Sequence, residues 1–80
     1  MIYVPGHKFR LDYPYKGTDR SISSLFQQGQ EYVIYNIRPA NDKIIYSIQN
    51  IITKFIFTIS FPSVEEGDKT FKVLELLRKN

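Results

Sequence analysis

The chain has 80 residues, of which 42% are hydrophobic and 15% aromatic, and it carries a formal net charge of +3 at pH 7. This length leaves room for one domain, residues 1–80, and the hydrophobic content excludes an intrinsically disordered chain. The sequence contains no cysteine, which excludes disulfides, thiol nucleophiles and zinc ribbons and favours a reducing compartment.

Membrane and export signals do not stand out in the sequence. No apolar run approaches the roughly 18 residues that a membrane-spanning helix needs. Residues 1–6 lack the basic region and the long apolar stretch of a signal peptide. We therefore expect a cytoplasmic protein without a membrane partner. Its mildly basic charge favours polyanionic partners only slightly.

The first expected element is a strand over residues 7–13, followed by Pro14, which removes a backbone donor and is expected to end it. Alternating apolar and polar residues are typical of a strand with one buried face. The apolar side consists of Phe9, Leu11 and Tyr13, and the polar side of Lys8, Arg10 and Asp12.

A short helix is expected next, with an N-cap at Thr18 or Asp19 and with Gly29 after its last turn. Its several serines lower the helix propensity, so packing of its apolar face against a sheet must stabilise it. Three residues have the spacing of one helix face: Ile22, Leu25 and Phe26.

The centre of the chain holds three β-rich runs, residues 31–38, 43–49 and 51–61, separated only by residues 39–42 and by Asn50. This spacing predicts an antiparallel meander. In the first run, Tyr32 and Ile34 share one face and Val33, Tyr35 and Ile37 the other, so we expect that strand to be covered on both sides. In the third run, alternation predicts a single buried face made of Ile51, Phe55, Phe57, Ile59 and Phe61.

A C-terminal helix is expected from Val64 to about Lys79. Ser63 and Glu66 have the spacing of a capping box, and the acidic residues of the first turns complement the helix dipole. Gly67 should weaken these turns by up to about 1 kcal/mol relative to alanine. The apolar stripe of this helix consists of Phe71, Leu74 and Leu77.

Together these elements predict a small α+β domain. It consists of a three-stranded antiparallel meander plus an N-terminal strand, one short helix after the first strand and a C-terminal helix, with the helices against one face of the sheet. The alternative is a small SH3-like β-barrel with a C-terminal helix, because the short β-rich segments and the long first loop also fit that fold.

Catalytic and metal-binding patterns find no support in the sequence. His7 has no Ser, Asp or second His at a recognisable spacing. The acidic residues after Ser63 lack EF-hand spacing, and residues 16–18 lack the glycine framework of a Walker loop. We therefore predict that the protein is not an enzyme, and we expect no catalytic residue, metal or cofactor.

A basic and aromatic N-terminal segment is the first candidate surface. Cations can contact phosphates and tyrosines can stack on bases, so this segment is a candidate nucleic-acid interface. The competing interpretation is that the cations only solvate a strand and the tyrosines pack at its end. The residues concerned are Lys8, Arg10, Tyr15, Lys16 and Arg20.

A second candidate surface lies on the meander, where Tyr32, Ile34, Tyr35 and Tyr46 occupy neighbouring strands. If Tyr32 and Ile34 face solvent, they form a patch that anchors a protein partner; the competing interpretation is that a helix covers them. The third strand of the meander adds another hypothesis. At a sheet edge it would need a strand from a second copy, as a homodimer, or from a target.

We therefore expect a small intracellular binding module that regulates or inhibits another protein. The cysteine-free composition, rich in Ile, Lys, Asn and Tyr, resembles that of proteins from AT-rich bacterial or phage genomes. A phage accessory protein acting on a host enzyme is one version of this hypothesis. The alternative is a nucleic-acid-binding protein that uses the basic and aromatic N-terminal face.

Overall fold

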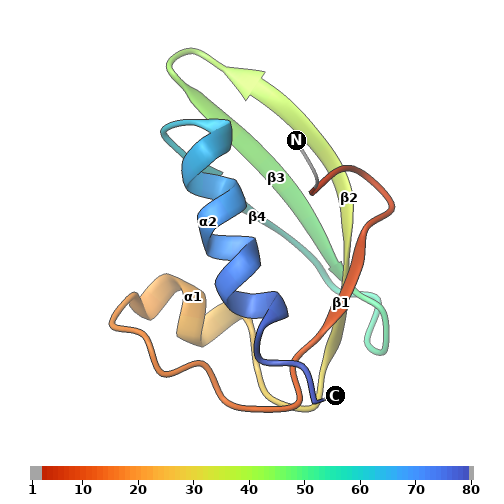
Figure 1. The fold of residues 1–80 in the computed structure, drawn as a ribbon. Coiled ribbons are helices and arrows are strands. Elements are labelled where there is room, and N and C mark those ends of the chain that lie inside the picture. Colours follow the sequence, from red (N-terminus) through yellow and green to blue (C-terminus); the bar gives the residue numbers. More distant parts are fainter. Residues whose placement is uncertain (1–2, 80) are drawn as a thin grey trace.

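Four antiparallel strands form one open sheet in the computed structural model, which describes residues 3–79 (Figure 1). The strands lie in chain order: β1 (Lys8–Arg10), β2 (Glu31–Ala40), β3 (Lys43–Asn50) and β4 (Ile56–Phe61). The helices are α1 (Arg20–Leu25) and α2 (Val64–Glu75), and α2 lies across one face of the sheet. The expected α+β class is confirmed, and the barrel alternative is wrong because β1 and β4 are separate edges.

Residues 1 and 2, which belong to the segment considered above for a signal peptide, lie outside the described part of the chain. Within residues 3–79, neither helix has the length and apolar character that a bilayer crossing demands.

The antiparallel meander is confirmed, and its first turn is tighter than expected. Pro39 pairs with Ile44 and Ala40 with Lys43, so only residues 41–42 connect β2 to β3. Asn41 has a φ of 55°, a left-handed conformation that asparagine tolerates better than most residues.

A β-bulge at Tyr35 changes which residues of β2 face the helices. Ile34 pairs with Ile48 but Asn36 pairs with Ser47, so β2 has one extra residue between them. The bulge shifts the alternation and puts Ile37, which pairs with buried Tyr46, on the core side. Tyr35 is 57% exposed. The expected second covered face is therefore wrong, because the helices cover one face of the sheet.

The loop between β3 and β4 is longer than the single residue expected, and β4 begins at Ile56 rather than at residue 51. Asn50 causes this difference. Its side-chain oxygen accepts hydrogen bonds from the backbone N–H groups of Ile52 (2.9 Å) and Thr53 (3.1 Å), which folds the chain back. Phe57, Ile59 and Phe61 face the core as expected, whereas Phe55 is 64% exposed and Ile51 lies in the loop.

The first strand and the last helix are both shorter than expected, for one shared reason. The backbone N–H groups of Asp12 and Tyr13 donate to the carbonyl of Leu77, at 2.9 and 3.0 Å. The N–H of Leu11 still donates to the carbonyl of Gln30, so the chain parts from the start of β2 at Asp12, where this contact joins it to the residues that follow the end of α2 at Glu75. Tyr13, expected in the core, is 48% exposed.

Helix α1 has only six residues and does not extend to Gly29 as expected. The expected N-cap at Asp19 is present, since its Oδ1 accepts from the N–H of Ser21 at 2.9 Å. At the other end, the hydroxyl of buried Tyr32 accepts from the N–H of Gln27 and donates to the carbonyl of Leu25. Tyr32 thus satisfies backbone groups at the helix end, and the chain leaves α1 there.

At the start of α2, Ser63 accepts from the N–H of Glu66 at 3.3 Å, one of the two bonds of the expected capping box. Phe71 and Leu74 of the expected stripe are buried, and Leu77 packs against them. The core between sheet and helices is largely aromatic and includes Phe9, Phe26, Tyr32, Tyr46, Phe61 and Phe71.

Candidate protein-binding site

One edge of the sheet, β4, has backbone groups that no other strand pairs with in residues 3–79. The N–H of Asn50 donates to the carbonyl of Phe55 at 2.9 Å. Hydrogen-bonded and non-bonded pairs alternate along an antiparallel ladder, so every second residue of β4 after Phe55 also bonds to β3. These residues are Phe57, Ile59 and Phe61, whose side chains face the core. The N–H and C=O groups that point away from β3 belong to Ile56, Thr58 and Ser60.

The two edges of the sheet differ in how well they are protected from further pairing. Exposed edges are usually short, charged, interrupted by proline or bulged. Edge strand β1 has three residues, and exposed Lys8 and Arg10 flank its one buried residue. Edge strand β4 has six residues without charge or proline, and its register with β3 contains no bulge. The β4 edge is therefore the one open to another strand.

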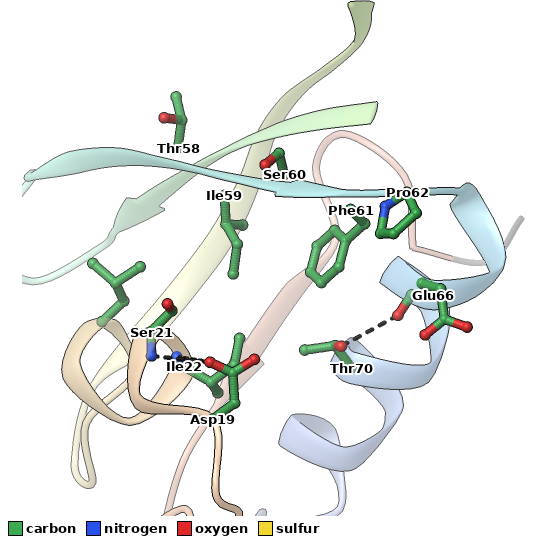
Figure 2. Close-up of a pocket in the computed structure, with 11 residues that line it drawn as sticks. Asp19, Ser21, Ile22, Thr58, Ile59, Ser60, Phe61, Pro62, Glu66 and Thr70 are labelled. Atoms are coloured by element: carbon green, nitrogen blue, oxygen red, sulfur yellow. Dashed lines mark hydrogen bonds between the residues drawn. The ribbon is translucent and has the colours of Figure 1, made fainter. Parts of the chain in front are cut away.

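A groove of about 510 Å³ lies beside this edge, between β4, α1 and α2 (Figure 2). Ile59 and Phe61 point from β4 toward the helices, whereas Thr58 and Ser60 point to the opposite side of the sheet. Ile22 of α1 is buried and lines the same space. β4 and α1 thus form an apolar wall of this groove, which we call the acidic cavity.

Its name comes from the two charged residues that line it, Asp19 and Glu66, both acidic. Oδ1 of Asp19 is engaged as the cap of α1. A carboxylate oxygen of Glu66 lies 3.6 Å from Nζ of Lys69. This ion pair is exposed and therefore contributes little to the stability of the fold. The hydroxyl of Thr70 donates to the backbone carbonyl of Glu66 at 3.2 Å. The cavity therefore favours a cationic group.

A second cavity, of about 370 Å³, lies farther along β4, and Leu25 lines both. We call it the aromatic cavity because Phe55 and Phe57 line it with stacked rings, 6.2 Å apart and 28° from parallel. Asn50 also lines it, and its Nδ2 donates to Oε1 of Gln30 at 2.9 Å. The residues that line this cavity carry no charge.

The structure places three of the four residues proposed for protein binding inside the core. Tyr32, Ile34 and Tyr46 are all buried on the face that the helices cover, which is the competing interpretation given above. Burial raises the pKa values of the Tyr32 and Tyr46 hydroxyls. Tyr35, displaced by the bulge, is the one of the four that reaches solvent.

The residues proposed for nucleic-acid binding are not brought together. Lys8 and Arg10 are exposed on β1, and Arg10 pairs with Asp12 at 2.9 Å. The chain between β1 and α1 then crosses to the opposite side of the molecule (Figure 1). Tyr15 packs against the core there, beside exposed Lys16, and exposed Arg20 begins α1.

His7 has a partner that explains its position. Its Nε2 lies 3.0 Å from Oε1 of Glu75, and its ring stands edge-on to Tyr3 at 5.1 Å. The Tyr3 hydroxyl donates to the other oxygen of Glu75 at 3.0 Å. These contacts attach the N-terminal segment to α2.

Comparison of the chain with protein-family models, with curated proteins and with solved structures finds no match. Sequence reasoning identified the third meander strand as a candidate edge but missed Asp19, Leu25 and Glu66 as neighbours of that edge. The sequence explained Asp19 and Glu66 as helix-start residues, and their approach to β4 depends on tertiary packing.

Proposed function

We propose that this protein is a binding module that adds an extended segment of another protein to the β4 edge as a fifth strand. The observation that carries the proposal is the uncharged, unbulged β4 edge beside a two-part groove. In strand addition, main-chain hydrogen bonds supply affinity and pockets for alternate side chains supply specificity.

The side chains of the added segment must supply much of the affinity. The outward backbone groups of β4 belong to three residues, and a protein hydrogen bond contributes only about 0.5–1.5 kcal/mol net. Bonds of this strength do not offset the loss of translational and rotational freedom on binding by themselves. The acidic and aromatic cavities provide the additional contacts.

A second copy of this chain fits the edge less well than a segment of a different protein. In a two-fold β4 to β4 pairing, each copy would present Phe57, Ile59 and Phe61 on the helix side. These side chains already pack against their own core and cannot also fill the neighbour's groove. The pairing would also add a second pair of carboxylates to the site, at Asp19 and Glu66.

The test uses a random-peptide display selection against the folded protein and two variants at one position. The N–H of Thr58 points away from β3, so Thr58→Pro removes a donor for the added strand without removing a bond to β3. Thr58→Val retains that N–H and is the matched control. We expect selected peptides to bind the wild type and Thr58→Val alike, and to bind Thr58→Pro at least about tenfold more weakly.

Two results would overturn the proposal. One is equal peptide affinity for Thr58→Pro while circular dichroism shows that this variant is folded. The other is a concentration-dependent dimer in sedimentation that Thr58→Pro dissociates, because a second copy would then occupy the edge. In NMR titrations with a selected peptide, the backbone amide signals of Thr58 and Ser60 should shift more than those of β1, at the opposite edge of the sheet.

A second candidate function, nucleic-acid binding, is supported by cations on the face of the sheet that the helices leave uncovered. The strand registers place Lys8, Arg10, Arg38 and Lys43 on that face, together with one acidic strand residue, Glu31. Affinity for a labelled single-stranded oligonucleotide should then fall steeply with salt and after Arg38→Glu. Thr58→Pro should leave that affinity unchanged, which separates this function from strand addition.

A further inference from the structure

We infer that the segment added to β4 carries an apolar or aromatic residue in the aromatic cavity and a lysine or arginine, two residues away, in the acidic cavity. This inference rests on the proposed function and specifies the partner's chemistry.

The spacing follows from the geometry of a strand. Residues of an added strand that lie opposite Phe57 and Ile59 would point toward the helices, as those two side chains do. Such positions are two residues, or roughly 6.5–7 Å, apart. Phe57 lines the aromatic cavity and Ile59 lines the acidic cavity, so each of the two positions has a cavity of its own. Leu25, which lines both, marks the boundary.

The aromatic cavity suits a side chain without charge. Its apolar wall consists of Leu25 and the rings of Phe55 and Phe57. Phe55 is 64% exposed, so an entering aromatic or aliphatic group would cover apolar surface that now faces water. A charged group would lose hydration there, because the cavity offers no opposite charge.

The acidic cavity suits a long basic side chain. The aliphatic stem of lysine or arginine can lie along Ile59 and Phe61, while its charged end reaches the carboxylates of Asp19 and Glu66. Among the described residues, neither lysine nor arginine lines the cavity, although the exposed ammonium of Lys69 lies 3.6 Å from Glu66, so an incoming cation would compete with Lys69 for that carboxylate. Charge-assisted hydrogen bonds to carboxylates are among the stronger polar contacts in proteins.

The test is an array of capped peptides with a constant Thr-rich extended sequence, in which two positions separated by one residue are varied. The array is probed with the wild type and with Asp19→Asn, Glu66→Gln and Glu65→Gln. Asparagine retains the helix cap. Glu65 lies in the same turn as Glu66, is exposed and lines neither cavity, so it is the matched control.

We expect the strongest peptides to pair an apolar or aromatic residue with a basic one. Glu66→Gln and Asp19→Asn should each reduce the preference for Lys or Arg over Gln by about three- to tenfold, whereas Glu65→Gln should not. Peptides that lose binding to Thr58→Pro yet show no basic preference would overturn this inference and leave strand addition intact. If no extended peptide binds at all, both proposals are wrong.

Discussion

The hydroxyl of Tyr46 lies against the backbone of Gly67, so close that a Cβ atom added to the glycine would be 2.9 Å from that oxygen. Gly67 is in the first turns of α2, where glycine reduces helix propensity, and it is buried. The close approach explains why this residue is there, because it lets α2 lie directly on the Tyr46 side chain of β3. Packing of α2 on the sheet therefore takes precedence over local helix propensity at this position.

Gly67→Ala should destabilise the protein by about 1–3 kcal/mol, although the same change stabilises an unconstrained helix by about 1 kcal/mol. The added methyl group would meet the Tyr46 hydroxyl at 2.9 Å and its ring carbons at 3.1 Å, so helix or ring must move. Urea denaturation followed by circular dichroism measures this effect. Stabilisation by the substitution would show that α2 shifts on the sheet at no cost.

Tyr46→Phe should leave stability equal to that of the wild type or slightly above it. Within residues 3–79, the buried Tyr46 hydroxyl has no hydrogen-bond partner, so removing it sacrifices no bond. The substitution also relieves the closest contact at Gly67. In the double variant, Gly67→Ala with Tyr46→Phe, the loss of unfolding free energy relative to the wild type should therefore be smaller than in Gly67→Ala alone, by at least about 0.5 kcal/mol. A double-mutant cycle measures this difference. A loss above about 1 kcal/mol for Tyr46→Phe would mean that the hydroxyl has a bonding role.

Asn50→Ala should destabilise the protein by about 1–3 kcal/mol, because it leaves the N–H groups of Ile52 and Thr53 without their acceptor. It also removes the bond from Asn50 to Gln30, which ties the β3–β4 loop to the start of β2. Gln49→Ala is the neighbouring control, since Gln49 makes one exposed, longer bond of 3.3 Å to the Lys54 carbonyl. Equal losses in the two variants would contradict the structural role of Asn50.

Much of the fold could be predicted from the sequence because alternation and turn residues are local signals. The meander, the core face of β4 and the Ser63 cap at the start of α2 follow from such signals. The ends of β1, α1 and α2 could not be predicted, because contacts between distant residues determine them. The bond from Asp12 to Leu77 and the hydroxyl of Tyr32 are two such contacts.

The site could be predicted only in part. The sequence offered the third strand of the meander as a sheet edge only as a hypothesis, and it did not indicate the neighbours of that edge. The tyrosines show why: Tyr32 and Tyr35 are both amphipathic, and sequence alone does not distinguish the one that caps α1 from the one displaced by a bulge. The bulge arises in the pairing of β2 with β3, and no residue type in β2 marks it.

Alkaline pH should weaken the contact between Tyr3 and Glu75. Burial and the hydrogen bond to Glu75 raise the pKa of the Tyr3 hydroxyl to about 12. Because the pKa in the folded protein exceeds that in the unfolded chain, about 10, this contribution is complete below pH 10 and is lost as pH rises toward 12. Tyr3→Phe should flatten the decline of the urea midpoint between these pH values. Tyr35→Phe, at an exposed side chain, is the control and should leave the decline unchanged.

Acidic pH should weaken a second contact between the chain after β1 and the chain after α2, which involves the Asp12 carboxylate. The backbone N–H of Lys79 donates to Oδ2 of Asp12 at 2.6 Å, and this bond, followed by the Arg10 contact, holds the pKa of that carboxyl below its usual value. A pKa lower in the folded protein means that the contribution is complete above the unfolded value of about 4 and is lost as pH falls through the folded value. Asp12→Asn should therefore lower stability at neutral pH and reduce its loss below pH of about 4. Asp42→Asn is the matched control, and an identical acid profile for the two variants would show that Asp12 does not link these chain ends.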